Sequence, residues 1–335
     1  MIRLRPFQGA AALAAVLVCA CVCAQTTLTV YTASQPELLL PYRNAFEKAH
    51  PDIKLEFLRD SASPIVARIL AEKARPKADV VMAVSVIGLE NLAAAKAIEP
   101  FKPSVASELS EQFLSPEGYW VGMNAWGSAI CLNTDLLRRR GLPVPQHWSD
   151  LTNPIYRGHI AMPHPLSSST GYMLILGWMQ VFGQDKVWDY IEALNRNILF
   201  YTFSGSRPVS MVAQGEVAIG LSSAAFAKPY DNPKIPLEVI EPNEGLGWDA
   251  EGAALVAGSR HKAEALQFLD FCAGKEVAAV AAAFSGVTAR ANFNTPAGNE
   301  TLKKMLPIDF AAAARDKKAI LARWQVVCGE KTSED

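Results

Sequence analysis

The sequence predicts an α/β protein with two lobes. Strand and helix patterns alternate along the chain, polar loops that contain serine follow most strands, and 335 residues exceed the length of one typical domain. Hydrophobic residues make up 50% of the chain and the formal net charge is −1, so the composition can fill ordinary cores. Because there is no basic surplus to neutralise phosphates, we do not expect a nucleic-acid partner.

The N-terminus has the pattern of an export signal. A basic start and a short apolar run, Ala10 to Ala20, are followed by small residues up to Ala24. This pattern predicts a signal peptide over residues 1–24, cleaved after Ala24, and a mature chain in the periplasm. The alternative is a lipoprotein signal with Cys21 as the lipidated residue. No later apolar run is long enough to span a bilayer.

The first third of the chain alternates strands with helices. Strands are expected at 27–32, 53–58 and 79–83, and helices at 38–50, 65–73 and 88–97. Ser34, Ser61, Ser63 and Ser85 each follow one of these strands. In open α/β sheets, ligands bind outside the carboxyl ends of the strands, so these serines are candidate ligand contacts. Each could instead cap a helix, and Ser34 has the capping-box spacing to Glu37.

A run of hydroxyl side chains begins a helix in the middle of the chain. Strands are expected at 119–123 and 129–133, with Trp126 between them, and at 158–162. Ser168, Ser169, Thr170 and Gly171 then precede a helix expected at 172–182. A helix start offers free N–H groups and a positive dipole end, which suit an anion. Helix capping and anion binding are both open for this run.

The remaining elements repeat the order of strand, hydroxyl loop and helix. Ser204, Ser206 and Arg207 lie between an extended segment and a short helix, and Ser222 follows a buried strand. A glycine-rich segment that contains Trp248 and Glu251 leads into another strand. The other elements are expected at 186–197, 198–202, 209–214, 218–221, 237–240, 253–257, 262–273, 276–283 and 307–324.

The sequence gives little support to a metal site or a catalytic site. Cys131, Cys272 and Cys328 remain after the leader, none with metal-ligand spacing, and a bridge between the last two is possible. No cofactor is expected. Motifs for nucleotide binding, serine hydrolysis or zinc hydrolysis are absent, so we do not expect an enzyme. Asp249 and Glu251 leave an exported hydrolase as the alternative.

Several segments resemble the iron-type solute-binding proteins of ABC importers. The resemblance covers nearly all of the mature chain and rests first on Leu28–Ala33, Lys77–Val81 and Trp148–Leu151. Three further segments are similar to the branch that binds 2-aminoethylphosphonate. They are Ser168–Tyr172, Tyr201–Pro208 and Gly245–Glu251.

The resemblance implies a two-lobed periplasmic-binding-protein fold (type II). Each lobe would be a mixed sheet flanked by helices, two strands would cross between the lobes, and the ligand would lie in the interlobe cleft. One lobe would comprise residues 25–120 and 253–298, and the other 121–252 and 299–335. The partners would be a small anionic ligand and an ABC permease, with the protein as a monomer. A sensor that reports to a membrane kinase is an alternative role.

The residues also favour one ligand class within this group. Ferric-iron members use adjacent tyrosines late in the second lobe, but the comparable segment here is Leu221–Ala227, with only Tyr230 nearby. An aminoalkylphosphonate would use hydroxyl donors and Arg207 for its phosphonate, and Glu251, Asp249 or a tryptophan for its ammonium. Phosphorylated sugars and phosphoglycerate are the alternatives, because the aminoethylphosphonate branch usually carries an acidic residue in the segment 222–227. The predicted ligand-binding residues are Ser34, Ser61, Ser63, Ser85, Trp126, Ser168, Ser169, Thr170, Gly171, Ser204, Ser206, Arg207, Ser222, Trp248 and Glu251.

Overall fold

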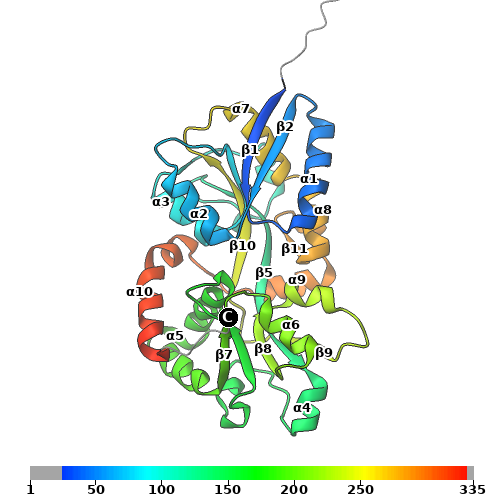
Figure 1. Ribbon diagram of the computed structural model, residues 1–335, viewed down its shortest axis with the longest axis vertical. Helices are drawn as coiled ribbons and strands as arrows, with labels where there is room; N and C mark the ends of the chain where they lie inside the picture. Colours follow the sequence, from blue (N-terminus) through cyan, green and yellow to red (C-terminus); the bar gives the residue numbers. More distant parts are fainter. Residues whose placement is uncertain (1–24, 330–335) are drawn as a thin grey trace, which may run out of the picture.

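The chain folds into two lobes, one stacked on the other along the long axis in Figure 1. The structure, a computed structural model, describes residues 25–329. The predicted signal peptide and its alternative lipid site at Cys21 lie outside the described residues. The predicted fold class, an α/β protein with the two-lobed architecture of periplasmic binding proteins, is confirmed.

Eleven strands form the sheets of the described chain. They are β1 (Thr26–Thr32), β2 (Ile53–Arg59), β3 (Val80–Ser85), β4 (Ile98–Glu99), β5 (Val121–Asn133), β6 (Ile160–Pro163), β7 (Ile198–Thr202), β8 (Ile219–Ser223), β9 (Leu237–Ile240), β10 (Trp248–Val256) and β11 (Val287–Thr288).

Helices cover both lobes (Figure 1). The α-helices are α1 (Pro36–Ala49), α2 (Ala62–Ala71), α3 (Val86–Ala94), α4 (Thr134–Arg140), α5 (Ser169–Asn197), α6 (Arg207–Gln214), α7 (Lys262–Cys272), α8 (Lys275–Phe284), α9 (Pro296–Lys304) and α10 (Phe310–Cys328). Short 3₁₀ turns are η1 (Ala106–Glu108), η2 (Glu111–Phe113), η3 (Ser149–Thr152), η4 (Pro154–Tyr156), η5 (Ala224–Tyr230) and η6 (Ala291–Phe293). Within residues 25–329, no helix combines the length and the apolar character needed to cross a membrane.

The strand order joins the lobes through β5 and β10. The order is β2-β1-β3-β10-β5-β8-β6-β7, with β4 beside β10, and β9 and β11 beside β5. The first half of β5 pairs with β10 and β11, and its second half pairs with β8 and β9. Because β1, β2 and β3 run parallel, their carboxyl ends lie at the same edge of the sheet, and Figure 1 shows this edge facing the second lobe.

Each lobe has its own core. In the first lobe, Leu28 and Phe46 pack with Phe268, and all three are fully buried. In the second lobe, Trp148 and Trp178 pack with Ile219. Burial of one such side chain contributes roughly 1.5–3 kcal/mol to stability. A further cluster joins the lobes, since it contains Leu89 of α3 together with Tyr172 and Leu176 of α5.

Helix α10 contacts both lobes. Near its start, the Phe310 ring lies 6.4 Å from Trp120 and 4.9 Å from Trp248 between centroids. Near its end, Trp324 lies 4.7 Å from His164 and 5.2 Å from Tyr201. Aromatic contacts at both ends therefore hold the middle of α10 beside the junction of the lobes.

Some sequence expectations are corrected by the structure. The two strands expected around Trp126 are one continuous strand, β5, because the whole segment pairs with β10 and β8. The helices expected at 172–182 and 186–197 form α5, broken only by Gly183 at φ 79°. The capping box of Ser34 is absent, because Gln35 is the N-cap of α1 and makes no side-chain cap. Cys131, Cys272 and Cys328 are all free and buried, so the possible bridge between the last two does not form.

Two glycines allow α5 to contact the chain that leads into β10. A Cβ at Gly177 would lie 2.4 Å from the backbone nitrogen of Gly247, and a Cβ at Gly247 would lie 2.3 Å from the carbonyl oxygen of Met173. Neither clash can be relieved by turning a side chain, because backbone atoms lie on both sides. The two segments therefore meet backbone to backbone.

Gly177→Ala is expected to lower the free energy of unfolding by about 2 kcal/mol or more, because the added methyl group pushes on backbone. Helix propensity alone predicts the opposite, a gain of about 1 kcal/mol. Urea unfolding of the purified protein measures the change. Gln180→Ala, at an exposed position of the same helix, is the control and should change stability little. A Gly177→Ala protein as stable as wild type would contradict the close contact.

Candidate functional site

The serines at the helix starts do not cap their helices. Ser61, Ser85, Ser168 and Ser206 occupy the N-cap positions of α2, α3, α5 and α6, and none of their side chains accepts a hydrogen bond from the first turn. The first N–H groups of these four helices therefore lack the side-chain partner that serine commonly supplies. Side chains at other helix starts do cap, namely Asn133, Thr295 and Asp309.

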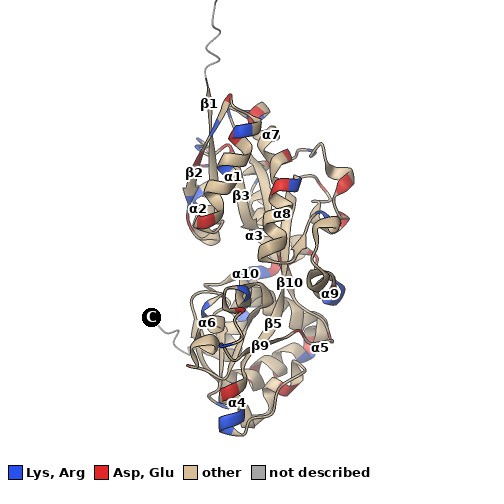
Figure 2. Ribbon diagram, turned by 90° about the vertical axis from the view of Figure 1, so that its right-hand side faces the viewer, with Lys and Arg blue, Asp and Glu red and all other residues tan. Residues whose placement is uncertain are grey.

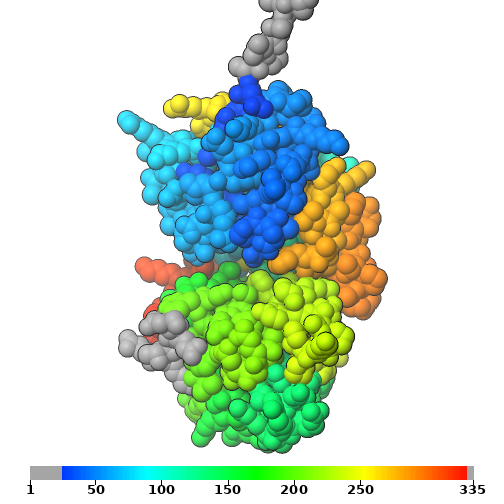
Figure 3. All heavy atoms as spheres, turned by 45° about the vertical axis from the view of Figure 1, so that its right-hand side comes forward, coloured from blue at the N-terminus to red at the C-terminus, as the bar shows by residue number. Residues whose placement is uncertain are grey.

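A small cavity lies between the lobes where three of the predicted residues meet. Ser63 and Ser85 line it from the first lobe and Ser169 lines it from the start of α5. Its volume is about 190 Å³. Lys317 of α10 also lines it, whereas the sequence analysis did not select this residue. Figure 3 shows the groove that separates the two lobes on the surface.

A second group of predicted residues surrounds Gly205 in the loop between β7 and α6. A Cβ at Gly205 would lie 2.3 Å from Thr170 Oγ1 and 3.2 Å from Ser168 Oγ, so this loop rests on the start of α5. Ser222 Oγ donates a hydrogen bond of 2.5 Å to the Gly205 carbonyl. Ser204 and Ser206 hydroxyl oxygens are 3.0 Å apart. The structure thus gathers five predicted hydroxyl residues at one end of the second lobe.

Gly171 has a structural role beside this group. A Cβ there would lie 2.6 Å from the Pro163 carbonyl oxygen and 2.9 Å from the Pro165 nitrogen. Only glycine lets the first turn of α5 fold back so closely onto the loop that follows β6. Gly171 therefore positions its neighbours Ser169 and Thr170.

The β3 strand carries a bulge that orients Ser85. The ladder between β3 and β10 skips Ala83, which has a positive φ of 54°. A bulge changes the direction of the following side chains. Ser85 Oγ then donates a hydrogen bond of 2.5 Å to Asp249 Oδ2, and the Ala250 N–H donates to the other carboxylate oxygen at 2.8 Å. Asp249 is fully buried.

The two carboxyls of β10 have raised pKa values. Burial raises the pKa of Asp249 to about 6, against the smaller lowering effect of the Ser85 hydrogen bond and of the Lys317 charge. Burial also raises the pKa of Glu251 to about 7, partly offset by hydrogen bonding with Asn124 and reinforced by the charge of Asp249. Both groups therefore titrate close to neutral pH.

The predicted tryptophans have different environments. Trp248 is buried, its Nε1 donates to the Leu306 carbonyl at 2.6 Å, and its ring packs on Phe310. Trp248 therefore stabilises the junction of the lobes by packing. Trp126 pairs with Asp249 across the strands β5 and β10. Its Nε1 is buried and has no hydrogen-bond partner among the described residues.

Of the predicted residues, only Ser63, Ser85 and Ser169 line the cavity, and Arg207, Ser61 and Ser34 are among those that do not. The guanidinium of Arg207 forms an ion pair with Glu216 at 3.1 Å and lies near Gln214 at 3.5 Å, so it turns along α6 away from the helix start. The Ser61 side chain is exposed at the start of α2. Ser34 is buried, and its carbonyl accepts a hydrogen bond from Arg59.

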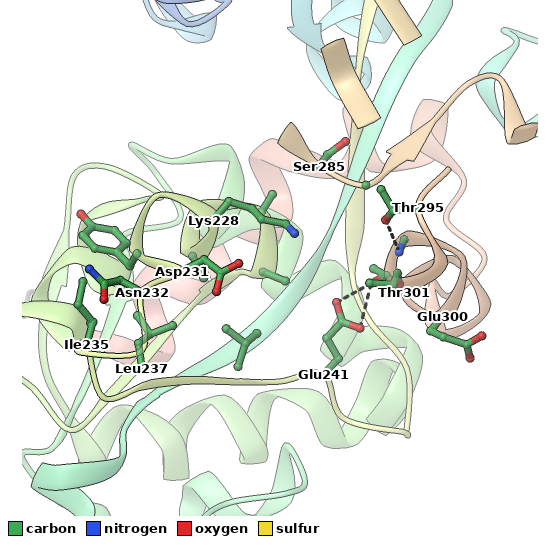
Figure 4. Close-up of a pocket in the computed structure, with 18 of the residues that line it drawn as sticks. Lys228, Asp231, Asn232, Ile235, Leu237, Glu241, Ser285, Thr295, Glu300 and Thr301 are labelled. Atoms are coloured by element: carbon green, nitrogen blue, oxygen red, sulfur yellow. Dashed lines mark hydrogen bonds between the residues drawn. The ribbon is translucent and has the colours of Figure 1, made fainter. Parts of the chain in front are cut away.

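A larger hollow lies elsewhere in the described chain, with a volume of about 710 Å³. Figure 4 shows Lys228 and Asp231 on one wall, facing Glu241 and Thr301 on the other. Thr301 donates to both carboxylate oxygens of Glu241, at 2.8 and 3.0 Å. This hollow contains none of the predicted residues, and its carboxylates disfavour an anion. The smaller cavity with its hydroxyls and Lys317 is therefore the candidate site.

Within residues 25–329, potential metal ligands are scattered, and charges of both signs are mixed in the view of Figure 2. No group of three or more His, Cys, Asp or Glu side chains within residues 25–329 is arranged to hold a metal ion. Figure 2 shows basic and acidic residues interspersed over both lobes.

Comparisons with known proteins agree on one family. The family of bacterial extracellular solute-binding proteins matches residues 75–314. An uncharacterized protein of Haemophilus influenzae is 29% identical over 316 residues, 90% of each chain. A probable ABC transporter periplasmic-binding protein of Sinorhizobium fredii is 27% identical over 86% of this chain and 82% of its own. The structure of the periplasmic binding protein AfuA from Actinobacillus pleuropneumoniae, with fructose 6-phosphate bound, has a TM-score of 0.81 at 26% identity and covers 91% of this chain and 99% of AfuA.

Stability should fall as pH rises from about 4 to about 8, because both carboxyls have folded-state pKa values above their ordinary ones. Over this range the folded state binds more protons than the unfolded state, so the unfolding free energy decreases with pH. Glu251→Gln should remove the part of this decrease that Glu251 causes, which is on the order of 2 kcal/mol of unfolding free energy between pH 5 and pH 8. Urea unfolding at several pH values measures this. Glu238→Gln, at an exposed position of β9, is the control, and an unchanged slope in Glu251→Gln would refute the assignment.

Proposed function

Because the chain belongs to the bacterial extracellular solute-binding proteins, we propose that it captures a small organophosphorus anion in the periplasm and delivers it to the permease of an ABC importer. The observation that carries this proposal is the set of serine N-caps near the cleft whose side chains do not cap their helices. At α3 the Val86 N–H instead interacts with Asp249, so the starts of α2, α5 and α6 are the ones offered to an anion. Helix starts of this kind offer N–H donors and a positive dipole end to an anion.

The cavity supports an anion contacted from both lobes. Ser63 and the start of α2 lie on one side, and Ser169 with the start of α5 lies on the other. A phosphate or phosphonate group has three terminal oxygens and can accept hydrogen bonds from both sides at once. Such a ligand would join the lobes, as in hinge closure around the ligands of periplasmic binding proteins.

The volume and the neighbouring carboxyls favour 2-aminoethylphosphonate as the first candidate. A hollow of about 190 Å³ suits a ligand of few atoms. An ammonium on that ligand could pair with Glu251 or stack on Trp126, which lie on the adjoining strands β10 and β5. The likeness to AfuA supports a sugar phosphate as the second candidate, because the same carboxyls can accept hydrogen bonds from sugar hydroxyls.

Movement between the lobes would centre on β5 and β10. We propose a division of 25–120 with 253–298 and 121–252 with 299–335, in which the chain first changes lobes at the start of β5 and changes again within β10. We propose that the protein acts as a monomer.

Isothermal titration calorimetry with 2-aminoethylphosphonate, fructose 6-phosphate, phosphoglycerate and Fe³⁺ tests the proposal. We expect heat of binding with at least one organophosphorus probe and none with Fe³⁺. A micromolar dissociation constant corresponds to about −8 kcal/mol. Binding of Fe³⁺ alone, or of none of the phosphorus compounds, would overturn the proposed ligand class.

Ser169→Ala should weaken binding of the probe about tenfold, because one hydrogen bond to a charged group is worth about 1.5 kcal/mol. Ser149→Ala, at an exposed position far from the cleft, is the matched control and should bind like wild type. Equal affinities of the two variants would show that Ser169 does not contact the ligand.

A further inference from the structure

Lys317 is the only lysine or arginine among the described residues that line the candidate cavity. It lies in the middle of α10, whose two ends pack on different lobes. Its Nζ lies 5.2 Å from the centroid of the Tyr172 ring, and the Tyr172 hydroxyl donates to the Ala313 carbonyl one turn earlier in α10. These contacts hold the lysine stem on the start of α5 and bring the ammonium to the cleft.

The donors of Lys317 are not used within the described chain. Its ammonium makes no hydrogen bond and no ion pair to any residue of the range 25–329. The charge of Asp249 acts on it and favours the protonated form, but burial has the larger effect and lowers the pKa of Lys317. A partly desolvated ammonium with free N–H donors is costly unless an anion completes its surroundings.

Ser85 and Asp249 explain why the cation is not neutralised directly. Ser85 Oγ already donates its proton to Asp249, so this hydroxyl presents only acceptor lone pairs to the cavity. The carboxylate is held by that hydroxyl and by the Ala250 N–H. Asp249 thus acts on Lys317 through its charge, without an ion pair between the two side chains.

We propose that Lys317 binds the ligand's phosphate or phosphonate group directly, and that it makes the site prefer a doubly charged anion to a singly charged one. This inference rests on the proposed function, and it identifies Lys317 as the residue that provides the positive charge of the site. Ser85, as an acceptor beside it, would take a hydrogen bond from a hydroxyl or ammonium of the same ligand. Arg207, which the sequence suggested for this task, is engaged by Glu216.

The test compares Lys317→Met with Lys318→Met. Methionine keeps much of the length of lysine but removes the charge, and Lys318 is the next residue of α10 with an exposed side chain. Calorimetry with the tightest organophosphorus probe of wild type should show affinity reduced about 10- to 100-fold in Lys317→Met and unchanged in Lys318→Met. Lys317→Arg, which keeps the charge, should retain more affinity than Lys317→Met.

Two further measurements separate a ligand contact from a structural role. The dependence of the dissociation constant on salt concentration should be weaker in Lys317→Met than in wild type, because a charge pair is screened by salt. Thermal unfolding shows whether Lys317→Met stays folded. The variant removes both a partly desolvated ammonium and a charge that partly offsets Asp249, so we expect a cooperative transition with only a small change in its midpoint.

The outcomes are distinguishable. If wild type binds the probe and Lys317→Met binds within twofold of it, the role of Lys317 is overturned and the proposed function stands. If wild type binds none of the organophosphorus probes, the proposed function itself fails. Equal losses in Lys317→Met and Lys318→Met would also overturn the inference, because net charge alone would explain them.

Discussion

A fully buried carboxylate, Asp249, is the constraint around which the cleft is arranged. It lies on β10 where this strand passes between the lobes, and two hydrogen bonds hold its oxygens. Burial of a charge is unfavourable unless hydrogen bonds or an opposite charge compensate it. Ser85 from β3 and Lys317 from α10 provide this compensation from two further elements. The position of the carboxylate therefore ties the sheet edge of the first lobe to the helix that spans both lobes.

Close backbone packing keeps these elements in place. The contact between Gly177 and Gly247 presses α5 against the chain just before β10, one residue from Trp248. Trp248 in turn packs on Phe310 at the start of α10. Small changes at the start of β10 therefore reach both α5, which begins at the cavity, and α10, which carries Lys317. Any movement of the lobes must conserve or remake this set of contacts.

The rule that ligands bind at the carboxyl ends of strands predicted Ser63 and Ser85, and the run of hydroxyls at a helix start predicted Ser169. All three line the candidate cavity, because strand order and serine position can be read locally. Local sequence patterns also predicted the α/β class and most of the helices. Lys317 could not be found this way, because it is separated from Ser169 by more than a hundred residues and lies in an alanine-rich helix whose lysines look solvated. Arg207 was selected for its serine neighbours, but the ion pair with Glu216 depends on how α6 ends at Gly215. A local sequence pattern therefore gives the wrong role for a residue whose side-chain direction is set by tertiary contacts.

The hydroxyl residues around Gly205 suggest how the second lobe is prepared for a ligand. Ser222 anchors the loop by its hydrogen bond to the Gly205 carbonyl, and Thr202 Oγ1 donates to the Ser204 carbonyl at 2.9 Å. These bonds fix backbone, so the loop need not be ordered when a ligand arrives, and less entropy is lost on binding. By contrast, Ser204 and Ser206 bond to each other through exposed hydroxyls that can rotate. A fixed backbone with rotatable hydroxyls suits an anion whose oxygens accept from several directions, which is the chemistry of a phosphate or phosphonate group.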